Sequence, residues 1–304
     1  MNIEEKDRNV LYGLRKSVIF YFYNSPNYKI IHELIQDYVD ISTPEFEFYK
    51  YLTGDLKKIK GNWSDLIIKI LSTSDYQNAV TCTMTEAKKD RLQNNLIQFS
   101  LSNYNPNYVL NLPNWIYFEF PNKVSWDEIY LFIRRACYSM TYFYISAGYS
   151  IGTNAHFYPK SIAESQKELM KFPFANTLTT NGNNLFFLKR LNIGIDGPNV
   201  IQVISQQLFE KVSSNDFKEL CNEEKLFYEL GEDYILINIL GQFAQEDENI
   251  MMYDEEKILY TEIIERLKKL YDLLKPIVIK YEKPKMFWKD NEWDKWINRY
   301  EIEC

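Results

Sequence analysis

Short runs of aromatic and β-branched residues alternate along the chain with segments of helical periodicity, and this alternation constrains the fold most. The run "SVIFYFYN" (17–24) has the composition of a buried strand. The next segment, "YKIIHELIQDYVDI" (28–41), spaces its apolar residues three and four positions apart, as a helix does. Strand, helix and strand recur before residue 152, an order that favours an α+β fold.

Further segments extend this pattern. The alternating runs "NAVTCTMTEA", "NLIQFSLSNYNP", "NWIYFEFP" and "TYFYISAGYSIG" predict strands, and "KLFYELGEDYILINILG" predicts two strands about a turn at 231–233. In "SWDEIYLFIRRACYSM", Ser125 and Glu128 can form a capping box at a helix start. Two more helices are expected in "GPNVIQVISQQLFEKVS" (197–213), with Pro198 near its start, and in 255–277.

The order of these elements defines the expected architecture. We expect an α+β fold of mainly antiparallel or mixed sheets with helices packed on one face. The polar, aperiodic stretch "NTLTTNGNN" (176–184) is the best linker candidate. We therefore expect an N-terminal α+β half over 1–175 and a C-terminal α+β half over 185–304, packed together as one compact unit. The loosely repeated order of elements also allows the halves to be related.

Charge and composition limit the classes of partner. Acidic residues outnumber basic ones by 42 to 35, which gives a net charge of −7. Such a surface repels nucleic acid and anionic membranes and attracts basic partners. No segment has the length and apolarity of a membrane span, and the charged N-terminus does not resemble a signal peptide. We expect a cytoplasmic protein that binds neither nucleic acid nor membrane.

The sequence contains no recognisable catalytic, metal or cofactor motif. The four cysteines (82, 137, 221 and 304) are widely spaced and form no metal-ligand pattern, so inert reduced thiols are expected. His32 lies among apolar residues of a predicted helix, and His156 follows a predicted strand without a nucleophile motif nearby. No phosphate-binding or dinucleotide-binding glycine pattern is present. We expect a protein that is not an enzyme and holds no cofactor or metal.

Two segments can carry recognition. The first combines acidic residues with adaptable apolar ones, and such a mixture suits protein binding. Its candidate contact residues are Glu246, Asp247, Glu248, Met251, Met252, Tyr253, Asp254, Glu255 and Glu256. The second is the C-terminal segment, where Trp293, Trp296 and Tyr300 share one side of a predicted short helix, just after Trp288. This aromatic side can bind a sugar or a base, but the free energy of burial favours docking on the body of the protein.

The second half of the chain resembles a bacterial immunity family. In order, "LKRLNIGIDGPNVIQVISQQLFEKV", "ELGEDYILINILGQFAQEDEN", the long helix ending in "LLKP" and "FWKDNEWDKWINRY" follow the pattern of the TsiV-like family. "SVIFYFYN" and "SWDEIYLFIRRACYSMTYFYISAGYSIG" extend the resemblance over residues 10–300. That family is linked to type VI secretion and paired with VRR-NUC-type nuclease toxins.

The resemblance implies an immunity protein that binds a cognate toxin and covers its active site. A nuclease must present Lys and Arg to phosphates, and an acidic inhibitor can occupy that basic surface. Two alternatives stay open. One is a carbohydrate hydrolase that uses two clustered carboxylates and the C-terminal tryptophans. The other is an immunity protein against an effector that is not a nuclease.

Overall fold

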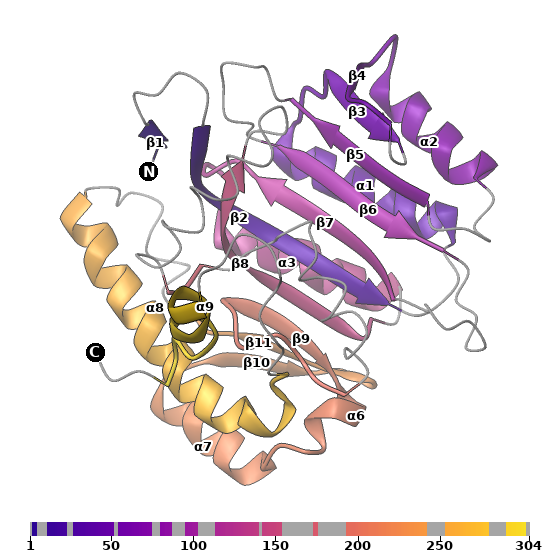
Figure 1. The fold of residues 1–304 in the computed structure, drawn as a ribbon. Coiled ribbons are helices and arrows are strands. Elements are labelled where there is room, and N and C mark those ends of the chain that lie inside the picture. The colour runs from indigo at the N-terminus through magenta and orange to yellow at the C-terminus, as the bar shows by residue number, and fades with distance from the viewer. Residues whose placement is uncertain are drawn as a thin grey trace.

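The computed structural model places every described strand in one sheet. Its eleven strands run in the order β10-β11-β9-β8-β2-β7-β6-β5-β3-β4, and β1 pairs with β2 beside this path (Figure 1). All pairs of named strands are antiparallel. The structure describes residues 2–4, 11–22, 27–51, 54–74, 80–86, 95–102, 113–139, 142–153, 173–175, 193–241, 253–279 and 290–301.

The first part of the chain supplies most of the strands. Its elements are β1 (Asn2–Glu4), β2 (Leu11–Phe22), α1 (Tyr28–Ser42), β3 (Phe48–Tyr51), β4 (Lys57–Lys58), α2 (Trp63–Thr73), β5 (Val80–Thr85), β6 (Leu96–Leu101), β7 (Asn114–Phe120), α3 (Trp126–Ser139) and β8 (Tyr144–Thr153). The later elements are β9 (Ile201–Ser205), α6 (Gln206–Phe209), α7 (Ser214–Glu223), β10 (Phe227–Leu230), β11 (Tyr234–Asn238), α8 (Tyr253–Leu274), the 3-10 turn η3 (Lys275–Ile277) and α9 (Asp290–Ile297).

Helices α1 and α3 cover one face of the central strands. The ring of Phe20 in β2 meets Phe132 of α3 edge-on, with centroids 5.5 Å apart, and Phe118 of β7 at 5.8 Å. Tyr38 of α1 packs on the same Phe118 ring at 4.9 Å. Because alternate strand residues point to opposite faces, these contacts place both helices on one side of the sheet.

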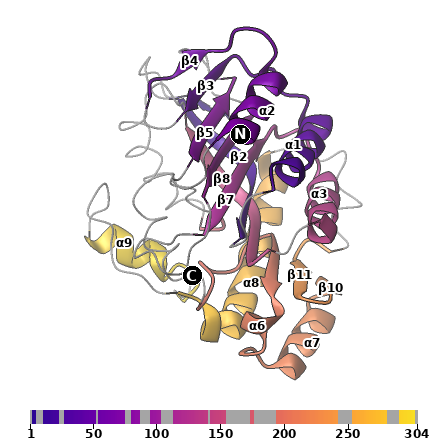
Figure 2. The same ribbon diagram turned by 90° about the vertical axis from the view of Figure 1, so that its right-hand side faces the viewer.

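Helix α7 covers the opposite face. Tyr228 of β10 packs against Phe217 of α7, with ring centroids 5.2 Å apart. Its neighbour Glu229 points the other way and pairs with Arg134 of α3 at 2.9 Å. Helices α3 and α7 therefore lie on opposite faces, and Figure 2 shows α1 and α3 on one side of the sheet with α9 on the other.

The expected α+β class, with an antiparallel sheet and helices packed on it, is confirmed. Helices α1 and α3 share one face, as expected for the first part, while α7 covers the other. Strand β8 pairs with β9 from Tyr144↔Ile204 to Ala147↔Ile201, so strands from both expected halves belong to one sheet. The expected linker at 176–184 lies outside the described residues.

One predicted helix is wrong. Residues 201–205 of the expected helix at 197–213 form β9, and only Gln206–Phe209 is helical. The strand lies between β8 and β11, and Ile201, Gln202, Val203 and Ile204 are all almost completely buried. A strand that is covered on both faces lacks the apolar–polar alternation that identifies strands, so its sequence is easily mistaken for that of a helix.

The predicted start of α3 is confirmed. Ser125 Oγ accepts a hydrogen bond from the Glu128 backbone N–H at 3.2 Å, and Glu128 Oε2 accepts one from the Ser125 N–H at 2.7 Å. This reciprocal pair satisfies two backbone donors that the first helical turn leaves free. It fixes where α3 begins and thus which of its residues face the sheet.

Candidate protein-interaction surface

The acidic segment expected to bind a partner falls largely outside the described residues. Glu246, Asp247, Glu248, Met251 and Met252 lie outside them, as does His156. Tyr253, Asp254, Glu255 and Glu256 form the first turn of α8, whose side chains there are not described. Their role in binding therefore stays a prediction. His32 is half-buried on α1.

The C-terminal aromatic residues pack on the body of the protein, so the docking prediction is confirmed. Trp293, Trp296 and Tyr300 are 3%, 4% and 6% exposed. The Arg299 guanidinium lies 4.1 Å from the Trp296 ring centroid and donates to the carbonyl of Pro173 at 2.9 Å. A sugar or base cannot reach rings that are already covered. Trp288 lies outside the described residues.

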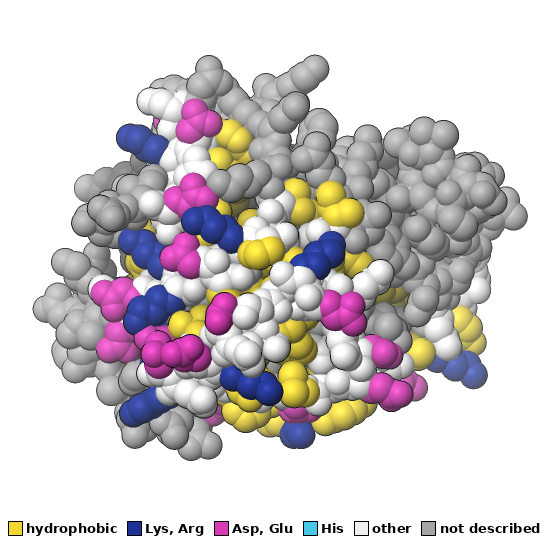
Figure 3. All heavy atoms as spheres, turned by 90° about the horizontal axis from the view of Figure 1, so that it is seen from below, with side chains coloured by type: hydrophobic (Ala, Val, Ile, Leu, Met, Phe, Trp, Pro, Cys, Tyr) yellow, Lys and Arg dark blue, Asp and Glu magenta, His cyan; other side chains and the backbone are white. Residues whose placement is uncertain are grey.

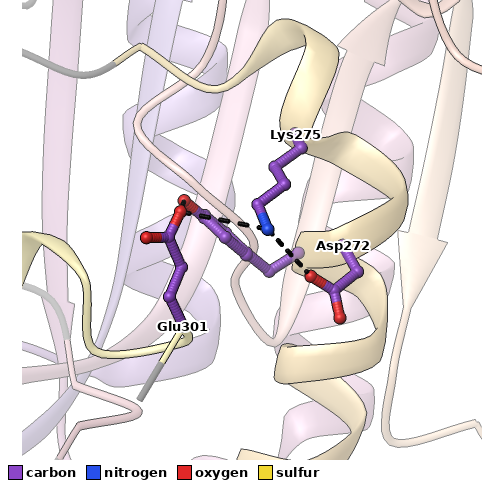
Figure 4. A network of polar contacts seen from close by, with 4 residues as sticks. Asp272, Lys275 and Glu301 are labelled. Atoms are coloured by element: carbon purple, nitrogen blue, oxygen red, sulfur yellow. Dashed lines mark hydrogen bonds and ion pairs between the residues drawn. The ribbon is translucent and has the colours of Figure 1, made fainter.

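A polar network holds the end of this segment to α8 and η3 (Figure 4). The Tyr271 hydroxyl donates to Glu301 Oε1 at 2.9 Å. Lys275 lies 3.3 Å from Asp272 Oδ1 and 4.0 Å from Glu301 Oε1. The charged groups of this network are partly exposed, so the buried aromatic rings dominate the docking free energy and the network adds orientation.

The described cysteines have properties of structural thiols. Cys82 and Cys221 are buried and Cys137 is half-buried, and all three are free. Burial raises the pKa of the Cys82 and Cys137 thiols to about 12 and that of Cys221 to about 11. Since the thiolate is the reactive form, this agrees with the expectation of inert thiols.

Large apolar side chains are exposed both on α3 and on β10, the strand that α3 contacts. Leu131 and Tyr138 of α3 are 50% and 67% exposed, and Phe227 and Leu230 of β10 are 45% and 61% exposed. We call these four residues the hairpin-edge surface. From below, the molecule shows hydrophobic side chains between acidic and basic ones (Figure 3). Exposed large apolar residues with a polar rim are typical of protein-binding sites.

Contacts from α3 fix β10 in place. Glu229 accepts hydrogen bonds from the hydroxyls of Tyr130 and Tyr138, each at 3.3 Å, and pairs with Arg134. The Tyr130 ring meets Phe227 edge-on at 5.6 Å. Burial, followed by the Glu229 charge, raises the pKa of Tyr130 to about 12. The Tyr130 hydroxyl donates to Glu229 and helps to orient this carboxylate.

The two edges of the sheet differ in chemistry. Strand β4 forms one edge with Lys57 and Lys58, both exposed, and charged edge residues of this kind discourage pairing with another chain. Strand β10 forms the other edge with the sequence FYEL and the exposed residues Phe227 and Leu230. The β10 edge is thus the one suited to contact with a partner.

A pocket of about 820 Å³ opens beside this surface. It is lined by Asn27, Ile30, Cys137, Tyr138, Ser139, Tyr142, Val203, Glu229, Leu230, Gly231, Glu232, Asp233 and Tyr234. The β10–β11 turn that forms its rim closes through a hydrogen bond from the Gly231 N–H to the Tyr234 carbonyl at 2.9 Å, as predicted for this hairpin. A Cβ on Gly231 would lie 2.3 Å from the Tyr234 ring, so glycine allows that ring to cover the turn.

The sequence did not identify the hairpin-edge surface or the pocket. The acidic residues of "GEDY" fall in the turn predicted at 231–233, and the exposure of Leu131, Phe227 and Leu230 depends on tertiary packing. The sequence signal that points to the pocket is the pair of turn carboxylates, Glu232 and Asp233, next to Tyr234. In the described part of the chain, no three His, Cys, Asp or Glu residues are grouped to hold a metal ion. No described helix is long and apolar enough to cross a membrane.

Comparison with known proteins gives a likeness of fold. No family model matches the sequence, and no curated protein matches it. Among solved structures, the chain is similar to "Pseudomonas aeruginosa T6SS protein PA0821" with a TM-score of 0.71 at 10% sequence identity. The alignment covers 97% of this chain and 83% of that one. Over 97% of its length, this chain is thus similar in fold to that protein.

Proposed function

We propose that the protein is an immunity protein that binds and neutralises a toxin delivered by type VI secretion. The hairpin-edge surface, which combines two exposed apolar side chains of α3 with two of the edge strand β10 beside a carboxylate-rimmed pocket, carries this proposal. The likeness to a T6SS protein over 97% of the chain supports the secretion context. The protein acts by binding, without chemistry of its own.

The toxin is proposed to be a nuclease with a basic active site. Such an enzyme concentrates Lys and Arg where phosphates bind, and a protein of net charge −7 is attracted to that surface over distance. Electrostatic steering speeds capture of the toxin before it reaches nucleic acid. The acidic segment with Glu246, Asp247 and Glu248 is a second proposed contact, and it adds negative charge to the inhibitor.

The hairpin-edge surface has the composition of an interface centre. Tyr138 and Phe227 are aromatic, and aromatic residues dominate the energetically important positions of interfaces. Glu229, Glu232 and Asp233 lie beside them in the pocket lining and supply a polar rim. Apolar contact provides affinity, while the carboxylates select a basic partner and exclude acidic ones.

Co-expression with a secreted toxin whose gene neighbours the gene of this protein tests the proposal. Cells that carry the wild-type protein are expected to survive toxin induction, and purified wild-type protein is expected to block cleavage of DNA or RNA by the toxin. Leu131→Arg and Leu230→Arg each place a cation on the hairpin-edge surface, where a basic partner repels it. Loss of one hot-spot residue corresponds to about 2 kcal/mol, or roughly thirtyfold in Kd.

Ile68→Arg is the matched control, because Ile68 is 39% exposed on α2, outside the hairpin-edge surface. This variant is expected to protect cells as the wild type does. Failure of the wild type to bind or neutralise the toxin would refute the immunity function. Equal toxin affinity of the Leu131, Leu230 and Ile68 variants would remove the hairpin-edge surface from the interface. If the toxin that the protein neutralises has no nuclease activity, the proposed class of target is wrong and the immunity function stands.

A further inference from the structure

We propose that the pocket at the β10–β11 turn binds the guanidinium group of an arginine side chain on the partner protein. This inference rests on the proposed function, because it assigns that arginine to the toxin. The pocket has about 820 Å³ of space, enough for an arginine together with part of the chain that carries it. Its lining combines carboxylates with tyrosine rings, and both attract this cation.

Negative charge in the pocket is incompletely neutralised. Three carboxylates line it, from Glu229, Glu232 and Asp233, whereas no Lys or Arg is among the described lining residues. Glu229 is shared by Arg134 and two tyrosine hydroxyls. The exposed Glu232 and Asp233 side chains have no hydrogen-bond or ion-pair partner in the described part of the structure. Two carboxylates at the rim are therefore available to a cation from outside.

Tyrosine supplies the remaining recognition groups. Tyr138, Tyr142 and Tyr234 all line the pocket. Tyr142 is only 5% exposed, and its hydroxyl has no hydrogen-bond partner within the described structure. A buried hydroxyl without a partner is unfavourable. A guanidinium N–H donor satisfies it once a small movement of the pocket wall opens this covered oxygen to the ligand. This hydroxyl is independent of the rim carboxylates and is a second group in the pocket that a donor-bearing ligand can satisfy.

Arginine fits these groups better than lysine does. The guanidinium is planar, stacks on aromatic faces and offers five N–H donors in a fixed arrangement. It can therefore contact a tyrosine ring and a carboxylate together, and it reaches the Tyr142 hydroxyl when the pocket wall moves to uncover that oxygen. The ammonium group of lysine is more strongly hydrated and lacks a planar face. The exposed Tyr138 ring already lies near one guanidinium, that of Arg134, at 5.9 Å.

NMR titration of the full-length protein with ¹³C-labelled tyrosine tests the inference. The probe is the peptide acetyl-Gly-Arg-Gly-amide at low ionic strength, and its control replaces arginine with citrulline, which has the same shape without charge. The arginine peptide is expected to shift the ring signals of Tyr138, Tyr142 and Tyr234, assigned through Tyr→Phe variants. The citrulline peptide is expected to leave them in place. Absence of shifts with arginine, or equal shifts with citrulline, would overturn the inference.

Two kinds of variant make the test specific. The double variant Glu232→Gln/Asp233→Asn is expected to weaken arginine-peptide binding about fivefold, since each exposed ion pair contributes modestly. Tyr142→Phe keeps the ring, removes a hydroxyl that has no partner in the described fold and is expected to weaken binding about tenfold. Asp55→Asn/Asp65→Asn makes the same change in charge at exposed positions outside the pocket, and its affinity is expected to match the wild type. Equal affinity of all three variants would refute the pocket.

The toxin completes the test. Glu232→Gln/Asp233→Asn is expected to weaken toxin binding, while Asp55→Asn/Asp65→Asn is expected to preserve it. If wild-type protein protects cells and both double variants bind toxin equally, the arginine inference fails and the immunity function stands. If wild-type protein does not bind the toxin, the immunity function fails, and the peptide titration still reports separately on the pocket.

Discussion

Trp296→Ala should undock the C-terminal helix from the protein. Trp296 is 4% exposed, stacks on Trp293 at 5.7 Å and lies beneath the Arg299 guanidinium. A buried tryptophan removes about 150–250 Å² from water, and at about 25 cal/mol per Å² this corresponds to roughly 4–6 kcal/mol. Measured costs of replacing buried aromatic residues by alanine, about 3–5 kcal/mol, agree with this range.

The loss includes a cation–π contribution. Arg299 is 9% exposed, and a contact of this kind is worth about 2 kcal/mol when it is shielded from water. A double-mutant cycle that combines Trp296→Ala with Arg299→Met should therefore give a coupling energy of about 1–2 kcal/mol. The Arg299 Nη1 donor also reaches the Trp296 carbonyl at 3.1 Å, and the alanine variant retains this backbone acceptor.

Urea unfolding and hydrogen exchange measure the effect. The free energy of unfolding is expected to fall by about 3–5 kcal/mol, or by the docking free energy of α9 if the helix opens before the sheet unfolds. In the second case, amides of residues 290–301 lose protection first, and trypsin cleaves faster at the exposed Lys295. Asp294→Ala, an exposed change on the same helix, is the control. A loss below about 1 kcal/mol with unchanged protection of α9 would show that the aromatic residues do not hold this segment.

Three further changes test local physical chemistry. Ser125→Ala removes the capping acceptor for Glu128 and should lower the free energy of unfolding by about 1 kcal/mol in urea titrations; no change would contradict the capping role. Burial raises the pKa of Asp196 to about 6, from an ordinary value of 3.8, so the folded protein holds a proton that the unfolded chain releases. Wild-type stability should therefore decrease as pH rises from about 4 to 6, and Asp196→Asn, which keeps an acceptor for Tyr144, should lack this component. Burial lowers the pKa of Lys16 to about 8, so the unfolded chain binds the extra proton above that pH, and wild-type stability should rise relative to Lys16→Met between about pH 8 and 10. A constant difference between the two proteins across that range would contradict the assignment.

Local signals predicted much of the fold. Alternating apolar residues marked β5, and aromatic runs marked β2 and β7, because side-chain burial there follows the strand geometry. The Ser125–Glu128 pair marked the start of α3. The apolar face of α9 indicated docking, since Trp293, Trp296 and Tyr300 are better buried than exposed. Strand β9 was missed because both of its faces are covered.

The candidate surface depends on contacts that no local pattern contains. Tyr130 and Glu229, which join α3 to β10, are 99 residues apart in the chain. Sequence periodicity places Leu131 on a helix but does not reveal which side of that helix lacks a covering element. Composition instead predicts a binding site in the acidic run around Glu246. Exposure of apolar side chains on an edge strand is a tertiary property, and it became visible only when the order of the strands was known.

The contacts behind the hairpin-edge surface explain how such a short edge strand can serve in recognition. Strand β10 has only four residues. If other elements did not hold so short a strand, binding would have to order its backbone, and the free energy needed for this would lower the affinity. Glu229 is held from α3 by Arg134, Tyr130 and Tyr138, while the next residue on one side, Tyr228, packs on α7. The strand is thus fixed from both faces before any partner arrives. The backbone that carries the exposed Phe227 and Leu230 is therefore preorganised. Binding loses less free energy to ordering of the strand, so burial of a small apolar area raises the affinity more.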